Sequence, residues 1–129
     1  MKWYEDPVYI KMAEKAVEIQ ELRNYKYPNS FPGLFRNNDD VYYQVSGWRE
    51  GKGSIIWLPN QSQLQGMVGI REAFDGMWVR WLRFCVDDTW VIHEYPLRFR
   101  ASMEQLWLAF VMKEKYGKVW NGEDWVTLR

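Results

Sequence analysis

One stretch near the end of the chain, residues 102–117, constrains the fold more than any other. Residues 106–112 within it are apolar without a break. Ser102 can accept a hydrogen bond from the amide of Gln105, and Gly117 can adopt the left-handed conformation that ends many helices. A helix that is apolar on every side for two turns has no face to turn to water. The stretch therefore predicts a buried helix with the rest of the chain packed around it.

The composition limits the class of protein. The 129 residues fit one domain, residues 1–129, and 17 Lys+Arg balance 17 Asp+Glu, so no net charge attracts nucleic acid or an anionic membrane. An aromatic share of 18% excludes a disordered chain. The single cysteine, Cys85, excludes an internal disulfide and suits a reducing compartment. No run approaches the ~20 apolar residues of a membrane span, so we expect a cytoplasmic protein without membrane contact.

A first helix is predicted over residues 7–23. Asp6 is a suitable N-cap, and Pro7 fits the first helical position, where its missing N–H costs nothing. Apolar residues then recur at helical spacing, and charged residues take the opposite face. The apolar set is Val8, Met12, Ala16, Ile19 and Leu22.

Two short strands follow a loop over residues 25–33 and a turn over residues 37–40. Residues 41–45 and 55–58 have the β-branched and aromatic content of strands, and we expect them to pair antiparallel. Near the C-terminus, Asn121 and Gly122 are a strong hairpin signal because both accept positive φ. We expect Trp120 and Trp125 to fix this hairpin to the body of the protein.

The middle of the chain is ambiguous. A helix capped by Asn60 or Ser62 can continue to about Cys85, either without a break or with one at Gly76. Residues 78–86 also suit a strand, and residues 89–93 look like a short one. We favour the helix. The predicted fold class is α+β, with about three main helices around a buried C-terminal helix, a small antiparallel sheet and a short terminal hairpin.

Three blocks of sequence carry a resemblance. They are residues 6–12 with 18–20, residues 57–65, and residues 104–120. Together they resemble small, uncharacterised proteins encoded in phages and prophages of Gram-positive bacteria. The resemblance implies a bacterial or phage-infected cytoplasm and a phage-related accessory role. It brings no activity, so no functional residue is carried over from it.

Catalytic and cofactor chemistry find little support in the residues. The glycines do not have the order of a phosphate-binding loop. One histidine is too few for most histidine-based metal sites and acid–base mechanisms. One cluster of Asp87, Asp88, His93 and Glu94 could hold a divalent ion. We favour its reading as a polar turn followed by an exposed strand end. We therefore predict no enzyme activity, no catalytic residue, no cofactor and no metal.

Arginines alternate with aromatic residues in the segment 78–100, a composition typical of surfaces that track single-stranded nucleic acid. The candidate surface consists of Trp78, Arg80, Trp81, Arg83, Arg98 and Arg100. The alternative is a core edge, with buried rings and with arginines paired to Asp87, Asp88 or Glu94, and we favour it. The sequence thus predicts a non-enzymatic accessory protein that binds another protein or a second copy of itself. The alternative function is a nucleic-acid-binding module that uses segment 78–100.

Overall fold

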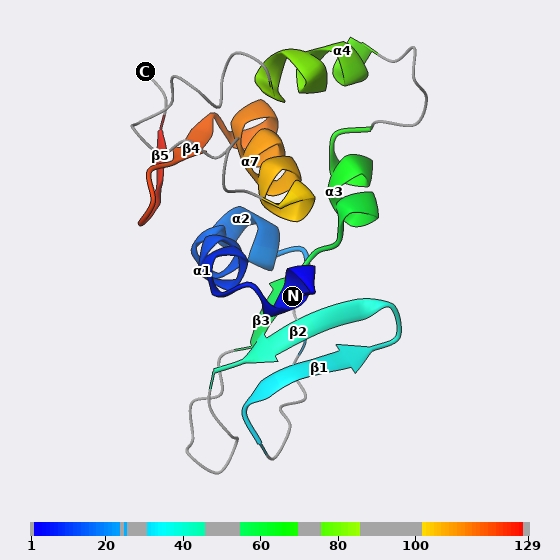
Figure 1. Cartoon of the computed structure of the whole chain (residues 1–129), viewed down its shortest axis with the longest axis vertical. Coiled ribbons are helices and arrows are strands. Elements are labelled where there is room, and N and C mark those ends of the chain that lie inside the picture. Colours follow the sequence, from blue (N-terminus) through cyan, green and yellow to red (C-terminus); the bar gives the residue numbers. More distant parts are fainter. Residues whose placement is uncertain are drawn as a thin grey trace. The chain divides into compact units, whose positions relative to one another are not determined.

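The structure, a computed structural model, describes residues 2–23, 25, 31–45, 55–69, 76–85 and 102–127. The chain divides into two compact units, Met1–Pro59 and Asn60–Arg129 (Figure 1). The first unit combines N-terminal helices with a three-stranded sheet. The second contains α3 (Gln61–Met67), α4 (Gly76–Arg83), α7 (Met103–Tyr116) and a two-stranded hairpin. The single domain expected from chain length stays a prediction.

The first unit opens with the short 3₁₀ helix η1 (Trp3–Glu5), followed by α1 (Pro7–Lys15). The predicted cap is confirmed, since the Asp6 carboxylate accepts from the Val8 N–H at 2.9 Å. Pro7 occupies the start of the helix. A carboxylate here satisfies one of the amides that the first helical turn leaves without a partner.

The prediction of one continuous helix over residues 7–23 is wrong at Ala16. This residue leaves the helical conformation (φ −82°, ψ 76°) and separates α1 from α2 (Val17–Gln20). In a continuous helix the Ala13 carbonyl would accept from the Val17 amide. Here it accepts from the side-chain amide of Gln20 at 2.9 Å and from the Ala16 amide at 3.1 Å. The bonds to Ala13 offset the helical bond that the break removes.

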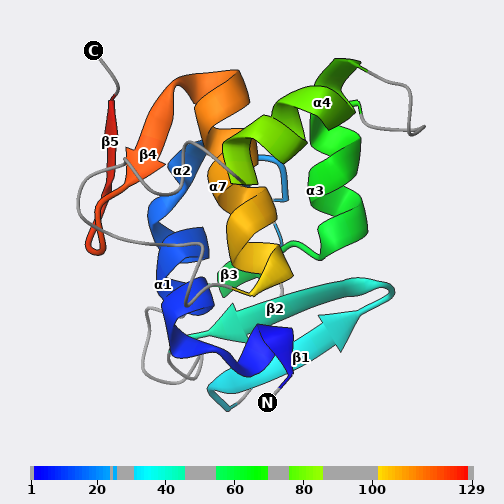
Figure 2. The same cartoon turned by 45° about the horizontal axis from the view of Figure 1, so that its top comes forward.

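The sheet of the first unit has the order β1–β2–β3, with both pairs antiparallel (Figure 2). Its strands are β1 (Gly33–Asn37), β2 (Asp40–Gln44) and β3 (Ile55–Leu58). The predicted pairing of the second and third strands is confirmed. The first strand was not predicted from the sequence. It is joined to β2 by a tight turn in which Asn38 takes φ 57°, a conformation that asparagine tolerates.

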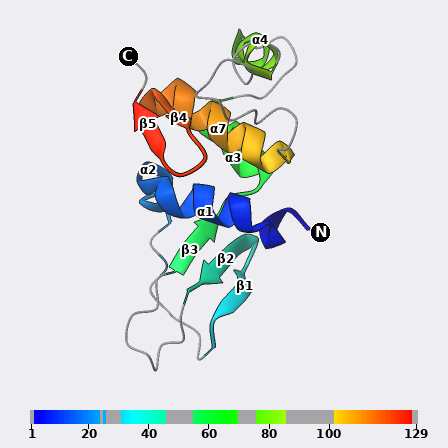
Figure 3. The same cartoon turned by 60° about the vertical axis from the view of Figure 1, so that its left-hand side comes forward.

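Helix α1 packs beside β3 (Figure 3). The Tyr9 hydroxyl donates to the Pro59 carbonyl at 2.6 Å, and the Tyr9 side chain is fully buried. A buried phenol needs such an acceptor, because its hydroxyl has lost its water partners. This bond fixes the first helix to the end of the third strand.

The second unit begins with α3 (Gln61–Met67), which has a reciprocal cap. The Asn60 side chain accepts from the Gln63 amide at 2.8 Å, and the Gln63 side chain accepts from the Asn60 amide at 2.9 Å. The predicted helix is interrupted earlier than the break expected at Gly76, since α3 ends at Met67 and Gly69 takes φ 74°. Gly76 is the first residue of α4 (Gly76–Arg83).

The helical alternative for segment 76–83 is therefore confirmed over the strand alternative. The predicted short strand at residues 89–93 lies outside the described residues.

Helix α7 (Met103–Tyr116) is the buried helix expected from its apolar run. The Ser102 hydroxyl accepts from the Gln105 amide at 3.2 Å, and Gly117 ends the helix at φ 63°. The side chains from Trp107 to Met112 are buried, and α3 packs along this helix. α4 contributes Trp81, whose ring stacks on Trp107 with 3.7 Å between centroids and 10° between planes.

The terminal hairpin pairs β4 (Lys118–Trp120) with β5 (Trp125–Thr127), as predicted. Its turn is longer than the two residues that Asn121 and Gly122 would make. The Asn121 side chain accepts from the amides of Glu123 and Asp124, both at 2.8 Å. Trp120 is buried, and its ring lies 5.1 Å from that of Trp125. The predicted α+β class holds for the chain.

Candidate protein-interaction site

A side chain closes the outer edge of β3. The Trp57 N–H donates to the Gln20 Oε1 at 2.8 Å, and the Gln20 Nε2 donates to the Trp57 carbonyl at 2.9 Å. A carboxamide offers one acceptor and two donors, so it can replace the two backbone groups of a neighbouring strand. At Trp57 the edge of the sheet is therefore not open to another strand.

The same pair of bonds fixes which backbone groups of β1 face outward. Since the Trp57 groups point to Gln20, Trp57 and its β2 partner Tyr42 form a pair without mutual hydrogen bonds. The Tyr42 groups then point to β1, where its partner is Phe35. Backbone groups alternate along a strand, so the N–H and C=O of Leu34 and Arg36 point away from the sheet.

Within the described residues, these outward groups leave the edge of β1 open. No described residue hydrogen-bonds to the backbone of Leu34 or Arg36 on this side. The Leu34 side chain is 39% exposed, and that of Arg36 is exposed as well. An exposed strand edge is a ready template for pairing with another chain. We call residues Leu34–Arg36, with the outward backbone groups of Leu34 and Arg36, the β1 edge.

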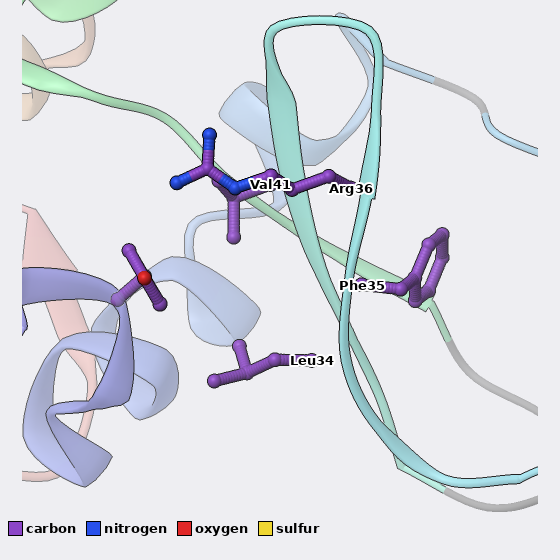
Figure 4. A pocket seen from close by; sticks show the side chains of 5 residues that line it. Leu34, Phe35, Arg36 and Val41 are labelled. Atoms are coloured by element: carbon purple, nitrogen blue, oxygen red, sulfur yellow. The ribbon is translucent and has the colours of Figure 1, made fainter.

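A pocket of about 190 Å³ lies next to the β1 edge (Figure 4). It is lined by Tyr4, Leu34, Phe35, Arg36 and Val41. Figure 4 shows Leu34 and Arg36 on one side of the strand and Phe35 on the other, as the alternation of a strand requires. Leu34 and the buried Val41 make part of the wall apolar.

Two cations surround Tyr4 at this pocket. The Arg36 guanidinium lies 5.5 Å from the centroid of the Tyr4 ring, and the Lys2 ammonium lies 5.7 Å from it. Hydrogen bonds from Lys2 and then from Arg36 favour the phenolate and lower the pKa of Tyr4. These contacts hold the charged end of Arg36 on η1.

Aromatic rings cover the other face of the sheet. Phe35 stacks on Tyr42 at 5.4 Å, and Tyr25 lies 5.6 Å from Phe35 and 4.9 Å from Tyr42. Phe35 is only half-buried, whereas Tyr42 is buried. Burial, followed by the charge of Asp40, raises the pKa of Tyr42. The three rings form an aromatic row that reaches the β1 edge at Phe35.

The surface predicted from segment 78–100 is described only in part. Trp81 is buried, as the core alternative predicts, and Arg80 pairs with Glu114 at 2.9 Å. Arg83 is exposed on α4. The Trp78 backbone lies in α4, but its side chain is not described. Arg98 and Arg100 lie outside the described residues, as do the predicted arginine partners Asp87, Asp88 and Glu94.

Other chemistry is sparse in the described part of the chain. Its residues contain no group of three or more His, Cys, Asp or Glu that could hold a metal ion. The cluster around His93 falls outside it. Burial raises the pKa of the Cys85 thiol to about 11, which disfavours the thiolate that a nucleophile needs. No helix among the described residues is long and apolar enough to cross a bilayer.

Sequence reasoning missed the residues that form this site. The turn predicted at residues 37–40 lies directly before a predicted strand, and a tight turn of this kind joins two strands, so it could have revealed β1. Gln20 carried no local signal, because its partner Trp57 lies 37 positions further along the chain.

No protein-family model, curated protein or solved structure matches this chain. Its function is therefore argued from the geometry of the site.

Proposed function

We propose that the protein is a non-enzymatic binding protein that takes an extended segment of another polypeptide chain as an additional strand at the β1 edge. The observation that carries the proposal is the difference between the two edges of the sheet. Gln20 closes the edge of β3 at Trp57, whereas the outward groups of Leu34 and Arg36 have no described partner. Strand addition gives affinity through main-chain bonds and selectivity through pockets for alternate side chains.

The pocket beside the edge supports selectivity of this kind. Leu34 and Arg36 lie on the pocket side of the strand (Figure 4). A residue opposite them on an added strand would place its side chain on the same face. Leu34, Val41 and the aliphatic part of Arg36 would favour an apolar side chain there.

A phage-related accessory role is a further part of the proposal, and it rests on the resemblance of the three sequence blocks. The genes that flank the coding sequence test it. Neighbours that encode phage structural or replication proteins would support the role, and neighbours from host metabolism would contradict it.

The nucleic-acid alternative has weaker support from the described residues. Base stacking needs an exposed ring, but Trp81 is 4% exposed and stacked on Trp107. Arg80 is paired with Glu114, whose carboxylate would compete with a phosphate, whereas Arg83 is exposed. Saturable, salt-sensitive quenching of tryptophan emission by a short oligonucleotide would nevertheless move this alternative to first place.

A peptide-display library selected on the protein tests strand addition. Arg36→Pro removes an outward N–H without touching the bonds between β1 and β2, because proline is tolerated on an edge strand. Arg36→Ala keeps the N–H and removes the charge. Selected peptides should shift the amide resonances of Leu34 and Arg36, lose at least tenfold in affinity for Arg36→Pro, and keep most of it for Arg36→Ala. Equal binding to the parent and to Arg36→Pro would contradict the proposal.

A further inference from the structure

We infer that the strand added at the β1 edge is the β1 strand of a second copy of this chain, antiparallel, with a two-fold axis at Phe35. The inference rests on the proposed function, since it uses the same edge. It identifies the partner, and it is argued from the register that the two β1 strands would adopt.

Hydrogen bonding selects this register. β1 pairs with β2 on both sides of Phe35. Within this paired stretch, Leu34 and Arg36 are the residues whose backbone groups point outward. With the axis at Phe35, Leu34 of each copy lies opposite Arg36 of the other. In each such pair, the N–H of each residue donates to the C=O of the other. The outward backbone groups of Leu34 and Arg36 on both strands would then all be hydrogen-bonded.

The neighbouring registers lose bonds or bring like charges together. An axis at Leu34 places Arg36 opposite Pro32 of the other copy, and proline has no N–H to donate. An axis at Arg36 places two guanidinium groups directly opposite each other, which is unfavourable. It also brings Leu34 opposite Asn38, which lies in the turn at φ 57° and not in the strand. The axis at Phe35 avoids all three faults.

The aromatic row gives the same register an apolar contact. Two Phe35 side chains would face each other as a pair without mutual hydrogen bonds, with about 4.5–5.5 Å between their Cβ atoms. Each Phe35 is half-buried and already stacked on Tyr42. The pairing would therefore join two aromatic rows and cover the side of Phe35 that water now reaches.

The assembly would stop at two copies. Identical edges used about a two-fold axis consume each other, so such an interface is closed. The remaining edge of each sheet is blocked at Trp57 by Gln20. Equal numbers of Lys+Arg and Asp+Glu, 17 each, mean that two copies meet without net repulsion. A contact of one short strand per copy is small, so we expect a reversible equilibrium and not a permanent dimer.

Sedimentation equilibrium over a wide range of protein concentration tests the inference. The parent chain should pass from monomer to dimer as concentration rises, without larger species. Arg36→Pro should remain a monomer, while Arg36→Ala should dimerise at least as well as the parent. Circular dichroism and melting curves show whether both variants keep the fold. A parent that stays monomeric at millimolar concentration, or an Arg36→Pro variant that dimerises like the parent, would overturn the inference.

Disulfide trapping tests the register independently of the proline variant. In a Cys85→Ser background, Phe35→Cys places two thiols opposite each other at the axis, whereas Leu34→Cys places them diagonally and further apart. Oxidation should yield covalent dimers at least tenfold faster from Phe35→Cys than from Leu34→Cys. Equal or reversed rates would contradict the register. A monomeric parent whose Leu34 and Arg36 amides still respond to selected peptides would refute the second copy while leaving strand addition intact.

Discussion

The side-chain amide of Gln20 pairs with both backbone groups of Trp57, at 2.8 and 2.9 Å, as a neighbouring strand would. Gln20 reaches this position because the helix breaks at Ala16, and its Nε2 also donates to the Ala13 carbonyl at 2.9 Å. One glutamine thus links the helix break, the closure of β3 and, through the alternation of the sheet, the opening of the β1 edge.

Replacing Gln20 should therefore destabilise the protein more than an ordinary surface change. Gln20→Ala leaves two backbone groups of a buried strand without their partner, and we expect a loss of about 2–3 kcal/mol in the free energy of unfolding. Gln20→Glu keeps the acceptor for the Trp57 N–H but turns a carboxylate toward two carbonyls, so its loss should be at least as large. Urea titration measures both. A loss below about 0.5 kcal/mol for Gln20→Ala, the range of neutral surface substitutions, would contradict the role of Gln20.

The aromatic contact between α4 and α7 should be a main source of stability for the second unit. Phe110 is fully buried, and its ring lies 5.5 Å from Trp81 and 5.4 Å from Phe84. Phe110→Ala should cost about 3–5 kcal/mol. Leu82→Ala is the control on α4, because Leu82 is 50% exposed and should be nearly neutral. If thermal melts give Phe110→Ala and Leu82→Ala the same melting temperature, Phe110 is not part of the core of the second unit.

The helix caps should each contribute measurably. Asp6→Ala removes the acceptor for the Val8 amide and should cost about 1 kcal/mol, and Ser102→Ala should cost a similar amount at the start of α7. Asp6→Asn keeps a capping oxygen without the charge, so chemical denaturation should place it close to the parent. An Asp6→Asn variant as unstable as Asp6→Ala would mean that the cap bond is not what stabilises α1.

The Cys85 thiol should react slowly in the folded protein. Its pKa rises from 9.0 to about 11 through burial, so at pH 8 the thiolate fraction falls about 100-fold, two pKa units, relative to the unfolded chain. Because the folded pKa is the higher one, the associated stability is present below pH 9 and is lost as the pH rises toward about 11. Alkylation rates with and without denaturant measure the effect. Comparable rates in the two states would contradict the burial of this thiol.

The parts of the fold that the sequence predicted are those with local signals. Asp6 and Ser102 are residue types that cap helices and so predict where α1 and α7 begin. The unbroken apolar run of α7 identifies a buried helix. The strands β2 and β3 were recognised by β-branched and aromatic residues, and the last hairpin by Asn121 and Gly122.

The parts that the sequence did not predict depend on distant partners. The break at Ala16 conflicts with the helical periodicity on both sides of it and is offset by Gln20, whose other partner lies on β3. The outward direction of Leu34 and Arg36 follows from a register that no local pattern contains. The site was missed for that reason, since a strand edge is a property of the sheet and not of the strand.

Amide hydrogen exchange at three consecutive residues tests the central claim most directly. In dilute protein the Phe35 amide should be protected by Tyr42, while the amides of Leu34 and Arg36 exchange at least tenfold faster because they face outward. Raising the protein concentration should slow the exchange of the Leu34 and Arg36 amides and leave the exchange rate of the Phe35 amide unchanged. Uniform protection of all three amides in dilute protein, or a Phe35 amide that exchanges fastest, would contradict an open β1 edge.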